Sequence, residues 1–524
     1  MMSRIRSFVF PVFAGCLAGF ALPGAAAPAP AKSALASLPM TEGRFQATDE
    51  SLRQYQVPEW FRDAKLGIWS HWGPQCVPMK DSWYARRLYE HETTDAKGKV
   101  TGPSPVHTFH RQTYGHPSEF GFKDIITRWK AEKFDPEALM ALYARTGARY
   151  FVSLGIHHDN FALYGSKIHR WNSVAMGPRR DIVAEWQRAA ARHGLRFGIT
   201  EHLAASWWFY SPSKGADKTG PKAGVPYDGN DPRYADLYWP DNHRPSFRYY
   251  GTDVPDSFKE AWYRRIAEIV DLYHPDLLYS DSPLPYPDDV GRRLVAHYYN
   301  ADARRHGGRV EAVYTCKEDA AGRWVRDIER GVREEIAPEP WQTDTCIGNW
   351  YYQTGYKYKT SAQVVHMLAD IVSKNGNLLL NFPQRPDGTL DEPTLKIIAD
   401  LGDWMAVNSE AIHGTRPWKR HGEGPTKLAK GRFGGLSDTG SYTAADFRFT
   451  TKGGALYAIA LGWPAAGRLL VTCLASAAGT VAEVALLGHA GRVEWRQTAE
   501  GLEVRLPDQR PCDLAYTLKI TGLP

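Results

Sequence analysis

The sequence predicts an α/β fold in which a (β/α)8-like TIM barrel is followed by a small antiparallel β-sandwich. Between about residues 57 and 415, capped amphipathic segments alternate with short apolar runs, which is typical of parallel strands covered by helices. After about residue 420 the pattern changes to short alternating stretches, such as 492–495 and 502–506, separated by Gly, Pro and Asp. We therefore expect the barrel over residues 46–418 and the sandwich over residues 419–524.

The first clear helix–strand unit begins at Asp135 and Pro136, which suit the N-cap and first position of a helix. Gly147 ends this helix, and residues 150–155 follow as a buried strand. Two further units repeat the order, with helices from Asp181 and over 258–273 and strands over 195–200 and 277–279. A region of this length suits a barrel with insertions, and segments 91–120 and 209–256 are expected to be its long loops.

The N-terminus predicts an exported protein, secreted or periplasmic. Two arginines precede an apolar run over residues 8–22, and small residues at 24–27 suit cleavage, so residues 1–27 are predicted to be a signal peptide. A lipoprotein through Cys16 and a retained membrane anchor fit less well, because the flanking residues and the length of the run are unfavourable. Residues 28–45, rich in Ala, Pro and Ser, are predicted to be a disordered leader.

Charge and cysteine usage exclude some classes of function. The formal net charge is +6 without a long Lys/Arg run, so nucleic-acid binding has little support. The cysteines show no CxxC spacing, which argues against a zinc or thioredoxin-like motif. The 18 Trp and 27 Tyr suit either sugar-stacking surfaces or an aromatic core. The oligomeric state is not specified by the sequence.

Chemically competent side chains follow five consecutive apolar runs. They are His71, then His157 and His158, then Glu201 and His202, then Asp281, and finally Lys317. Active sites of such barrels lie at the C-terminal ends of the strands, so we expect these side chains to meet in one site.

Asp281 directly follows an apolar strand, where it is either a nucleophile or a structural acid that caps a helix or forms an ion pair.

The pair His157 and His158 has three possible roles: hydrogen bonding to sugar hydroxyl groups, metal ligation together with His71, His202 and Asp159, or burial in a core. A retaining glycosidase also needs a second carboxyl group about 5–5.5 Å from the nucleophile. Spacing alone does not choose among the downstream candidates Glu318, Glu329, Glu334, Glu335 and Glu339.

Several motifs in order carry a family resemblance. They are residues 60–68 running into His71-Trp72-Gly73, then His157-His158-Asp159, then residues 273–281, 373–381 and 401–412. Together they resemble the α-L-fucosidases of glycoside hydrolase family 29 over nearly the whole chain from residue 57.

The resemblance implies retaining hydrolysis of α-L-fucosides on fucosylated oligosaccharides or glycans, without a metal or other cofactor. It implies that Asp281 is the nucleophile and, by counting through Lys317, that Glu329 is the acid/base. It further implies sugar contacts from His71, Trp83, Tyr84, His157, His158, Glu201, His202, Tyr279, Lys317 and Trp350.

Three positions depart from the family pattern. Ser82 stands where Glu is common, Lys317 where Arg is common, and Glu201-His202 where Tyr-Ser is frequent. Replacing Arg by Lys exchanges a bidentate donor for a point charge. Two alternatives therefore stay open: a barrel glycosidase for another sugar, and a carbohydrate-binding protein without catalysis. The second becomes preferable if no carboxyl group lies near Asp281.

Overall fold

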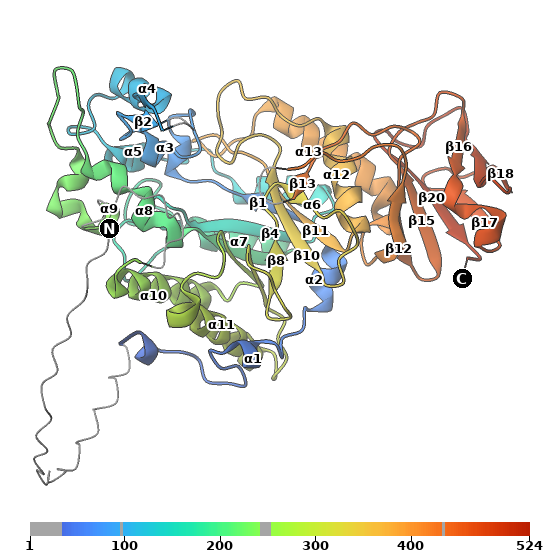
Figure 1. Ribbon diagram of the computed structural model, residues 1–524, viewed down its shortest axis with the longest axis horizontal. Helices are drawn as coiled ribbons and strands as arrows, with labels where there is room; N and C mark the ends of the chain where they lie inside the picture. Colours follow the sequence, from blue (N-terminus) through green and yellow to red (C-terminus); the bar gives the residue numbers. More distant parts are fainter. Residues whose placement is uncertain (1–33, 95–97, 241–252, 432–434, 524) are drawn as a thin grey trace, which may run out of the picture.

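The centre of the protein is a closed barrel of eight parallel strands (Figure 1). The computed structural model describes residues 34–94, 98–240, 253–431 and 435–523, so the predicted signal peptide over residues 1–27 lies outside the described residues. The order round the barrel is β1-β11-β10-β8-β7-β6-β5-β4. The strands are β1 (Leu66–Ser70), β4 (Tyr150–Ile156), β5 (Arg196–Glu201), β6 (Leu277–Ser280), β7 (Val313–Cys316), β8 (Val325–Asp327), β10 (Trp341–Cys346) and β11 (Gly376–Asn381). The predicted barrel is confirmed.

In the described part of the chain, six long helices cover the outside of the barrel, and each of them follows one of the barrel strands in the chain. They are α6 (Pro136–Arg145), α7 (Ile182–Arg192), α10 (Asp256–Tyr273), α11 (Arg292–Arg305), α12 (Ser361–Ser373) and α13 (Glu392–Asn408). The Asp135 and Asp181 side chains accept hydrogen bonds from the first-turn amides of α6 and α7, as the sequence predicted. Residues 317–324 and 328–340, after β7 and β8, contain no helix. Over the described ranges, no helix combines the length and apolarity needed to cross a bilayer.

Two long insertions lie side by side at one end of the barrel. The first, after β1, contains α3 (Tyr84–Arg87), β2 (Thr93–Thr94), β3 (Val100–Gly102), α4 (Pro105–Thr113) and α5 (Phe122–Arg128). The second, after β5, contains α8 (Ser206–Phe209) and α9 (Ala235–Tyr238). Arg86 of the first insertion donates to the backbone oxygen of Trp208 in the second at 2.9 Å. The predicted long loops fall within these insertions, and residues 95–97 and 241–252 lie outside the described part of the chain.

The described part of the predicted disordered leader, residues 34–45, is ordered, which corrects that prediction. Leu35, Leu38 and Phe45 are buried, and the segment runs beside α10 and α11 into α1 (Asp49–Leu52) and α2 (Glu59–Ala64) (Figure 1). Asn300 of α11 accepts from the Phe45 amide at 3.0 Å and donates to the Phe45 oxygen at 2.9 Å. Three apolar anchors therefore outweigh a composition that is otherwise typical of disorder.

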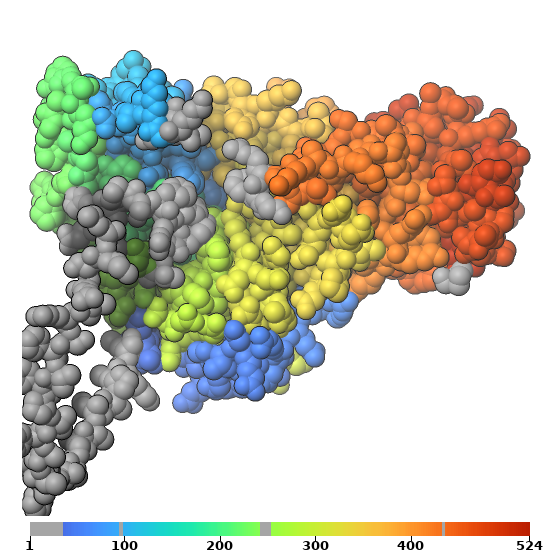
Figure 2. Space-filling model, viewed as in Figure 1, coloured from blue at the N-terminus to red at the C-terminus, as the bar shows by residue number. Residues whose placement is uncertain are grey.

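The C-terminal region is two antiparallel sheets around a shared apolar core, and it forms one end of the molecule (Figure 2). One sheet is β12 (Arg416–Glu423), β14 (Phe447–Lys452), β15 (Ala455–Ala460), β20 (Tyr516–Thr521) and β17 (Glu483–Leu486). The other is β16 (Arg468–Val471), β19 (Leu502–Arg505) and β18 (Glu494–Gln497). The predicted sandwich is confirmed. Its first strand begins at Arg416, so the predicted boundary at 418/419 falls inside β12.

The inside of the barrel changes from apolar to polar along its axis. Alternate residues on the strands point inward, and the apolar ones include Tyr150, Leu277, Tyr279 and Leu379. Gly67 on β1 leaves room for one of these, because a Cβ there would lie 2.2 Å from the Tyr150 ring. Polar side chains gather towards the C-terminal ends of the strands, where the site lies.

Candidate active site

A cavity of about 720 Å³ opens at the C-terminal ends of the barrel strands. The predicted site residues that line it are His71, Trp83, His157, His158, His202, Asp281, Lys317, Glu329 and Trp350. The cavity therefore brings together side chains from at least five strand ends that are far apart in the sequence.

Each strand end is held by a backbone bond to a neighbouring strand or loop. The amide of His71 donates to Asn381 Oδ1 at 2.9 Å, and the amide of His202 donates to the oxygen of Ile156 at 2.9 Å. The amide of Asp281 donates to the oxygen of Glu201 at 3.0 Å. These bonds fix the backbone positions of His71, His202 and Asp281, so the site is preorganised before a ligand binds.

Asp281 is a buried carboxylate surrounded by cations and donors. Its Oδ1 lies 2.5 Å from Lys317 Nζ and accepts from the Tyr279 hydroxyl at 3.1 Å, and its Oδ2 lies 2.9 Å from His202 Nδ1. Burial acts to raise the pKa of Asp281, but Lys317 and His202 hold it well below its usual value. The carboxylate is therefore ionised at neutral pH, the state a nucleophile requires.

Glu329 lies on the loop after β8 and contacts the same ammonium group as Asp281. Lys317 Nζ donates to Glu329 Oε2. Because both carboxylates contact one nitrogen atom, their nearest oxygens lie within about 5 Å of each other, as in retaining glycosidases. The other predicted candidates for the second acid, Glu318, Glu334, Glu335 and Glu339, do not line the cavity.

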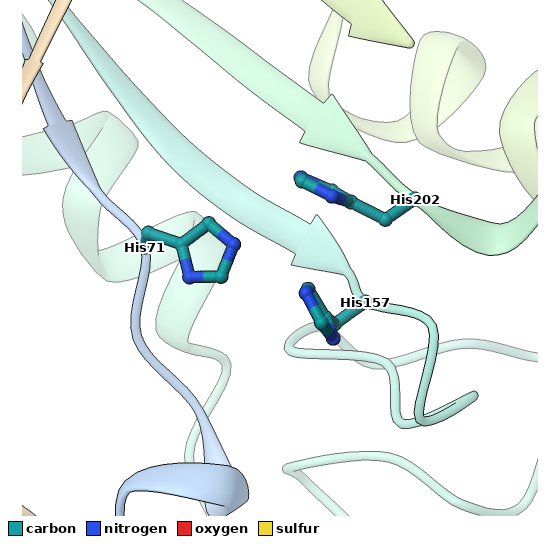
Figure 3. Close-up of side chains that lie close together, drawn as sticks. All are labelled: His71, His157 and His202. Carbon is teal, nitrogen blue, oxygen red and sulfur yellow. The ribbon is translucent and has the colours of Figure 1, made fainter. Parts of the chain in front are cut away.

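Three histidine rings, His71, His157 and His202, point towards one another from the ends of β1, β4 and β5 (Figure 3). The ring centroids of His71 and His157 are 4.9 Å apart, and those of His71 and His202 are 5.2 Å apart. Burial lowers the pKa of His71 and of His157 well below the usual value. Neutral rings both donate and accept hydrogen bonds, which suits sugar hydroxyl groups.

The same rings were also candidates for metal ligation. His157 Nδ1 lies 2.6 Å from Gln75 Nε2, and Gln75 Oε1 accepts from the Ala85 amide. The Gln75 amide is thereby oriented to donate to Nδ1, so Nε2 of His157 carries the hydrogen and offers no lone pair to a metal. A second grouping, His158 with His202 and Asp281, lies beside the Lys317 ammonium, which opposes a further cation.

Indole rings form much of the apolar wall of the cavity. Trp69 and Trp350 have ring centroids 5.3 Å apart, and Trp69 is stacked on His202 at 5.9 Å. Arg330 covers Trp350 at 4.5 Å from its ring centroid. Trp83 extends the wall towards the second insertion, where it contacts Trp208. Such faces suit the apolar side of a sugar ring.

Three residues that were expected to contact the sugar lie outside the cavity lining. Glu201 shares the outward face of β5 with Phe197 and Ile199, and it accepts from the Leu203 amide at 2.9 Å and from Trp262 Nε1 at 3.2 Å. Tyr84 is buried in the first insertion, where its hydroxyl pairs with His110 Nδ1 at 2.7 Å. The Glu201 and Tyr84 side chains therefore have structural partners away from the site.

Tyr279 is the third residue that does not line the cavity, although it lies directly beneath it. Tyr279 and Asp281 are two residues apart and point to the same inward side. The ring packs within the barrel, and only the hydroxyl reaches up to Asp281. Tyr279 supports the carboxylate instead of lining the sugar.

The cavity also has lining residues that sequence reasoning missed. They are Trp69, Arg87, Pro283, Arg326, Asp327, Ile328, Asp344 and Asn349. Asp327 is the last residue of the short strand β8 and Asp344 lies inside β10, so neither follows an apolar run in the sequence. The signal that was available is the run of four polar residues at 342–345 within a strand, of which Gln342 and Asp344 face inward.

Two carboxyl groups that contact one ammonium group at the C-terminal end of a parallel barrel suit the hydrolysis of a glycosidic bond. Comparison with known proteins gives the family. The α-L-fucosidase family model matches residues 33–410, and the α-L-fucosidase C-terminal domain model matches residues 441–521. The chain belongs to the α-L-fucosidase family.

Relatives and solved structures of this family match nearly the whole chain. Human plasma α-L-fucosidase is 28% identical over 504 residues, covering 92% of this chain and 93% of its own. Human tissue α-L-fucosidase is 26% identical over 502 residues, covering 92% of each chain. The crystal structure of Thermotoga maritima α-fucosidase matches with a TM-score of 0.69 and 27% identity, over 91% of this chain and all of that one. Its complex with fucose matches with a TM-score of 0.68.

Proposed function

We propose that this enzyme releases terminal α-L-fucose from fucosylated oligosaccharides or glycans with retention of configuration, with Asp281 as nucleophile and Glu329 as acid/base. The observation that carries this assignment is the contact of both carboxylates with the Lys317 ammonium, which gives the separation a retaining mechanism needs. The Thermotoga maritima enzyme with a similar structure has been solved with fucose bound.

In the first step an Asp281 oxygen attacks the anomeric carbon of the fucose. The bond from that carbon to the leaving oxygen breaks, and Glu329 gives its proton to this oxygen, so the rest of the glycan leaves as an alcohol. In the second step Glu329 takes a proton from water, which attacks the anomeric carbon. The bond to Asp281 then breaks, the carboxylate is restored, and two inversions give net retention.

The remaining cavity residues bind and orient the sugar. The neutral rings of His71, His157 and His158 offer donors and acceptors to hydroxyl groups, and burial lowers the pKa of His158 to about 3. The indoles of Trp69 and Trp350 offer apolar faces to the ring and methyl group of the fucose. A desolvated pocket of this kind also strengthens the electrostatic contacts to the transition state.

Hydrolysis of an aryl α-L-fucoside tests the proposal. We expect Asp281→Asn to lower kcat by at least about a thousandfold, since it removes the attacking oxygen. Asp400, which is half-buried on α13 and pairs with Lys396 away from the cavity, provides a matched control, and Asp400→Asn is expected to leave kcat unchanged. Turnover by Asp281→Asn at the wild-type rate would show that another group attacks.

A different sugar specificity is the second candidate. It rests on the departures from the family pattern at Ser82, Lys317 and Glu201, of which Ser82 lines the cavity beside Asp81, the residue that could replace the missing Glu. Both Asp81 oxygens are engaged, Oδ1 by the Trp83 amide at 2.7 Å and Oδ2 by Arg87 at 2.5 Å. A panel of aryl glycosides separates the two candidates, since strong turnover of another sugar with none of fucose would favour the second. The third alternative, a binding protein without catalysis, required Glu329 to be remote from Asp281, and the two are close.

We also propose that the protein is exported after removal of residues 1–27. The arginines, apolar run and small residues of this segment support it. Sequencing the N-terminus of the protein recovered from its natural source tests it, with a start near residue 28 expected. Recovery of the intact segment in the cell interior would contradict it.

A further inference from the structure

We propose that Asp327 and Asp344 share a single proton beneath Asp281 and, through Tyr279, act as positioning residues for the nucleophile. The proposal deepens the function proposed above, on which its catalytic part rests. Neither aspartate follows a strand end, and neither belongs to the two-carboxylate mechanism itself.

The arrangement centres on the Tyr279 hydroxyl. This one oxygen lies 3.1 Å from Asp281 Oδ1, 3.3 Å from Asp327 Oδ1 and 3.3 Å from Asp344 Oδ2. Asp327 and Asp344 are about 1 % exposed, and Tyr279 is fully buried. Three carboxyl groups therefore meet at one buried hydroxyl group at the floor of the cavity.

Counting hydrogen atoms shows that the three carboxyl groups cannot all be ionised in this geometry. A phenol has one hydrogen to donate, and an ionised carboxylate only accepts. Asp327 Oδ1 and Asp344 Oδ2 both lie 3.3 Å from the same Tyr279 oxygen, so a proton on either aspartate allows it to donate to that oxygen. With that proton present, a carboxylic acid supplies a donor to the group, and the Tyr279 hydrogen is free to point at Asp281.

The charges facing the pair explain where the proton stays. Gln342 Nε2 donates to Asp327 Oδ2 at 2.9 Å, while Asp344 Oδ1 has no hydrogen-bond partner among the described residues. Burial raises the pKa of Asp327 to about 6 and that of Asp344 well above its usual value. The other titratable or charged groups that face the pair are Tyr150, Tyr279, Asp281, Cys316, Lys317 and Glu329. Lys317 is the only cation in this set, and it already contacts Asp281 and Glu329.

The shared proton has a functional consequence. While it is held, Tyr279 donates to Asp281 Oδ1, which leaves Oδ2 beside His202 and His158. Loss of the proton at high pH adds a negative charge to Asp327 and Asp344, which Tyr279 connects to the nucleophile. The Tyr279 hydroxyl then donates to these aspartates instead of Asp281. The nucleophile then loses a positioning donor, so turnover falls.

The test is the pH profile of kcat/KM for a dinitrophenyl α-L-fucoside, whose leaving group needs no proton from Glu329. This ratio reports ionisations of the free enzyme. Asp344→Asn keeps a donor at this position but cannot ionise, so we expect its alkaline limb to disappear or to move up by at least about one pH unit. Asp344→Ala removes the donor, and we expect kcat to fall about tenfold or more below that of Asp344→Asn. A profile of folded Asp344→Asn that coincides with the wild type would overturn the proposal.

Tyr279→Phe provides a second route that preserves the ring and its packing. We expect kcat to fall about ten- to a hundredfold with little change in KM, because one hydrogen bond to a charged group is lost. Tyr143→Phe is the matched control, since the Tyr143 hydroxyl is buried on α6 without a hydrogen-bond partner in the described structure. Equal kcat values for the two variants would also overturn the proposal.

Infrared spectroscopy separates this proposal from the proposed function. A protonated carboxyl group gives a carbonyl stretch that a carboxylate lacks, and because burial also raises the pKa of Asp159 to about 7, we expect the shared proton to appear at neutral pH as a band of the wild type that is missing from Asp344→Asn. Absence of this band in the wild type would refute the shared proton. A wild type that shows the band and hydrolyses no α-L-fucoside would refute the proposed function and the positioning role that rests on it, while the shared proton itself would stand.

Discussion

Replacement of Lys317 by Met removes the ammonium group that contacts both Asp281 and Glu329. At an effective dielectric constant of about 20, unit charges about 3 Å apart attract by ~5 kcal/mol. Burial of the carboxylate opposes part of this attraction, but the ammonium of Lys317 still holds the pKa of Asp281 well below its usual value.

The sign of the effect follows from the direction of the pKa shift. At every pH above the unfolded-state pKa of Asp281, the carboxylate is ionised and its ion pair contributes fully to stability. As pH falls through the lower folded-state pKa, the charge and this stabilisation are lost. In Lys317→Met the folded-state pKa of Asp281 rises. The acidic limb of kcat/KM should therefore move to higher pH, and the free energy of unfolding at neutral pH should fall by about 3–5 kcal/mol.

The assay is kcat/KM for an aryl α-L-fucoside from acid to neutral pH, with unfolding in urea measured in parallel. Lys396→Met is the matched control, because Lys396 pairs with Asp400 on an exposed helix face and its loss should cost at most about 1 kcal/mol. If the acidic limbs of Lys317→Met and the wild type superimpose, Lys317 does not set the charge of the nucleophile, and the electrostatic reasoning is wrong.

Three further changes test the fold and the cavity wall. Gly67→Ala places a Cβ 2.2 Å from the Tyr150 ring, so urea unfolding should show a loss of about 1–3 kcal/mol, and an unchanged midpoint would count against the packing described. Phe45→Ala removes a fully buried anchor of the N-terminal segment and should cost about 3–5 kcal/mol, whereas a loss below about 0.5 kcal/mol would mean that this segment does not stabilise the barrel. Trp350→Ala should lower kcat/KM about ten- to a hundredfold by removing an apolar face of the cavity, and full activity would place the sugar elsewhere.

Much of the fold was predictable because local signals agreed with the global pattern. Asp135 and Asp181 were readable as helix caps, and the apolar runs between helices were readable as buried strands. The ordered segment over residues 34–45 was not predictable from composition. Its stability comes from partners on α11, more than 250 residues away in the chain.

The part of the site that lies directly after the barrel strands could be predicted from the sequence. His71, His202 and Asp281 follow apolar runs and meet in the cavity. Glu201 also ends a strand but faces outward, since side chains alternate and Phe197 and Ile199 share its face. Whether a side chain points into or out of the barrel depends on the register between neighbouring strands, and the sequence of one strand does not reveal that register.

The interior carboxyl groups were beyond sequence reasoning for a related reason. Asp344 lies within β10, where an acid normally argues against a buried strand. Its tolerance there depends on Tyr279 and Asp327, which come from β6 and β8. Only the closed barrel brings these three strands to one point.

Trapping the covalent intermediate tests the central claim most directly. A 2-deoxy-2-fluoro-L-fucosyl donor with an activated leaving group slows breakdown of the intermediate, so the sugar stays on the attacking residue. Peptide mass spectrometry should then find the fluorofucosyl group on Asp281, with no label on Asp281→Asn. A label on another carboxylate, or complete hydrolysis of the natural substrate with inversion and no label, would contradict the account.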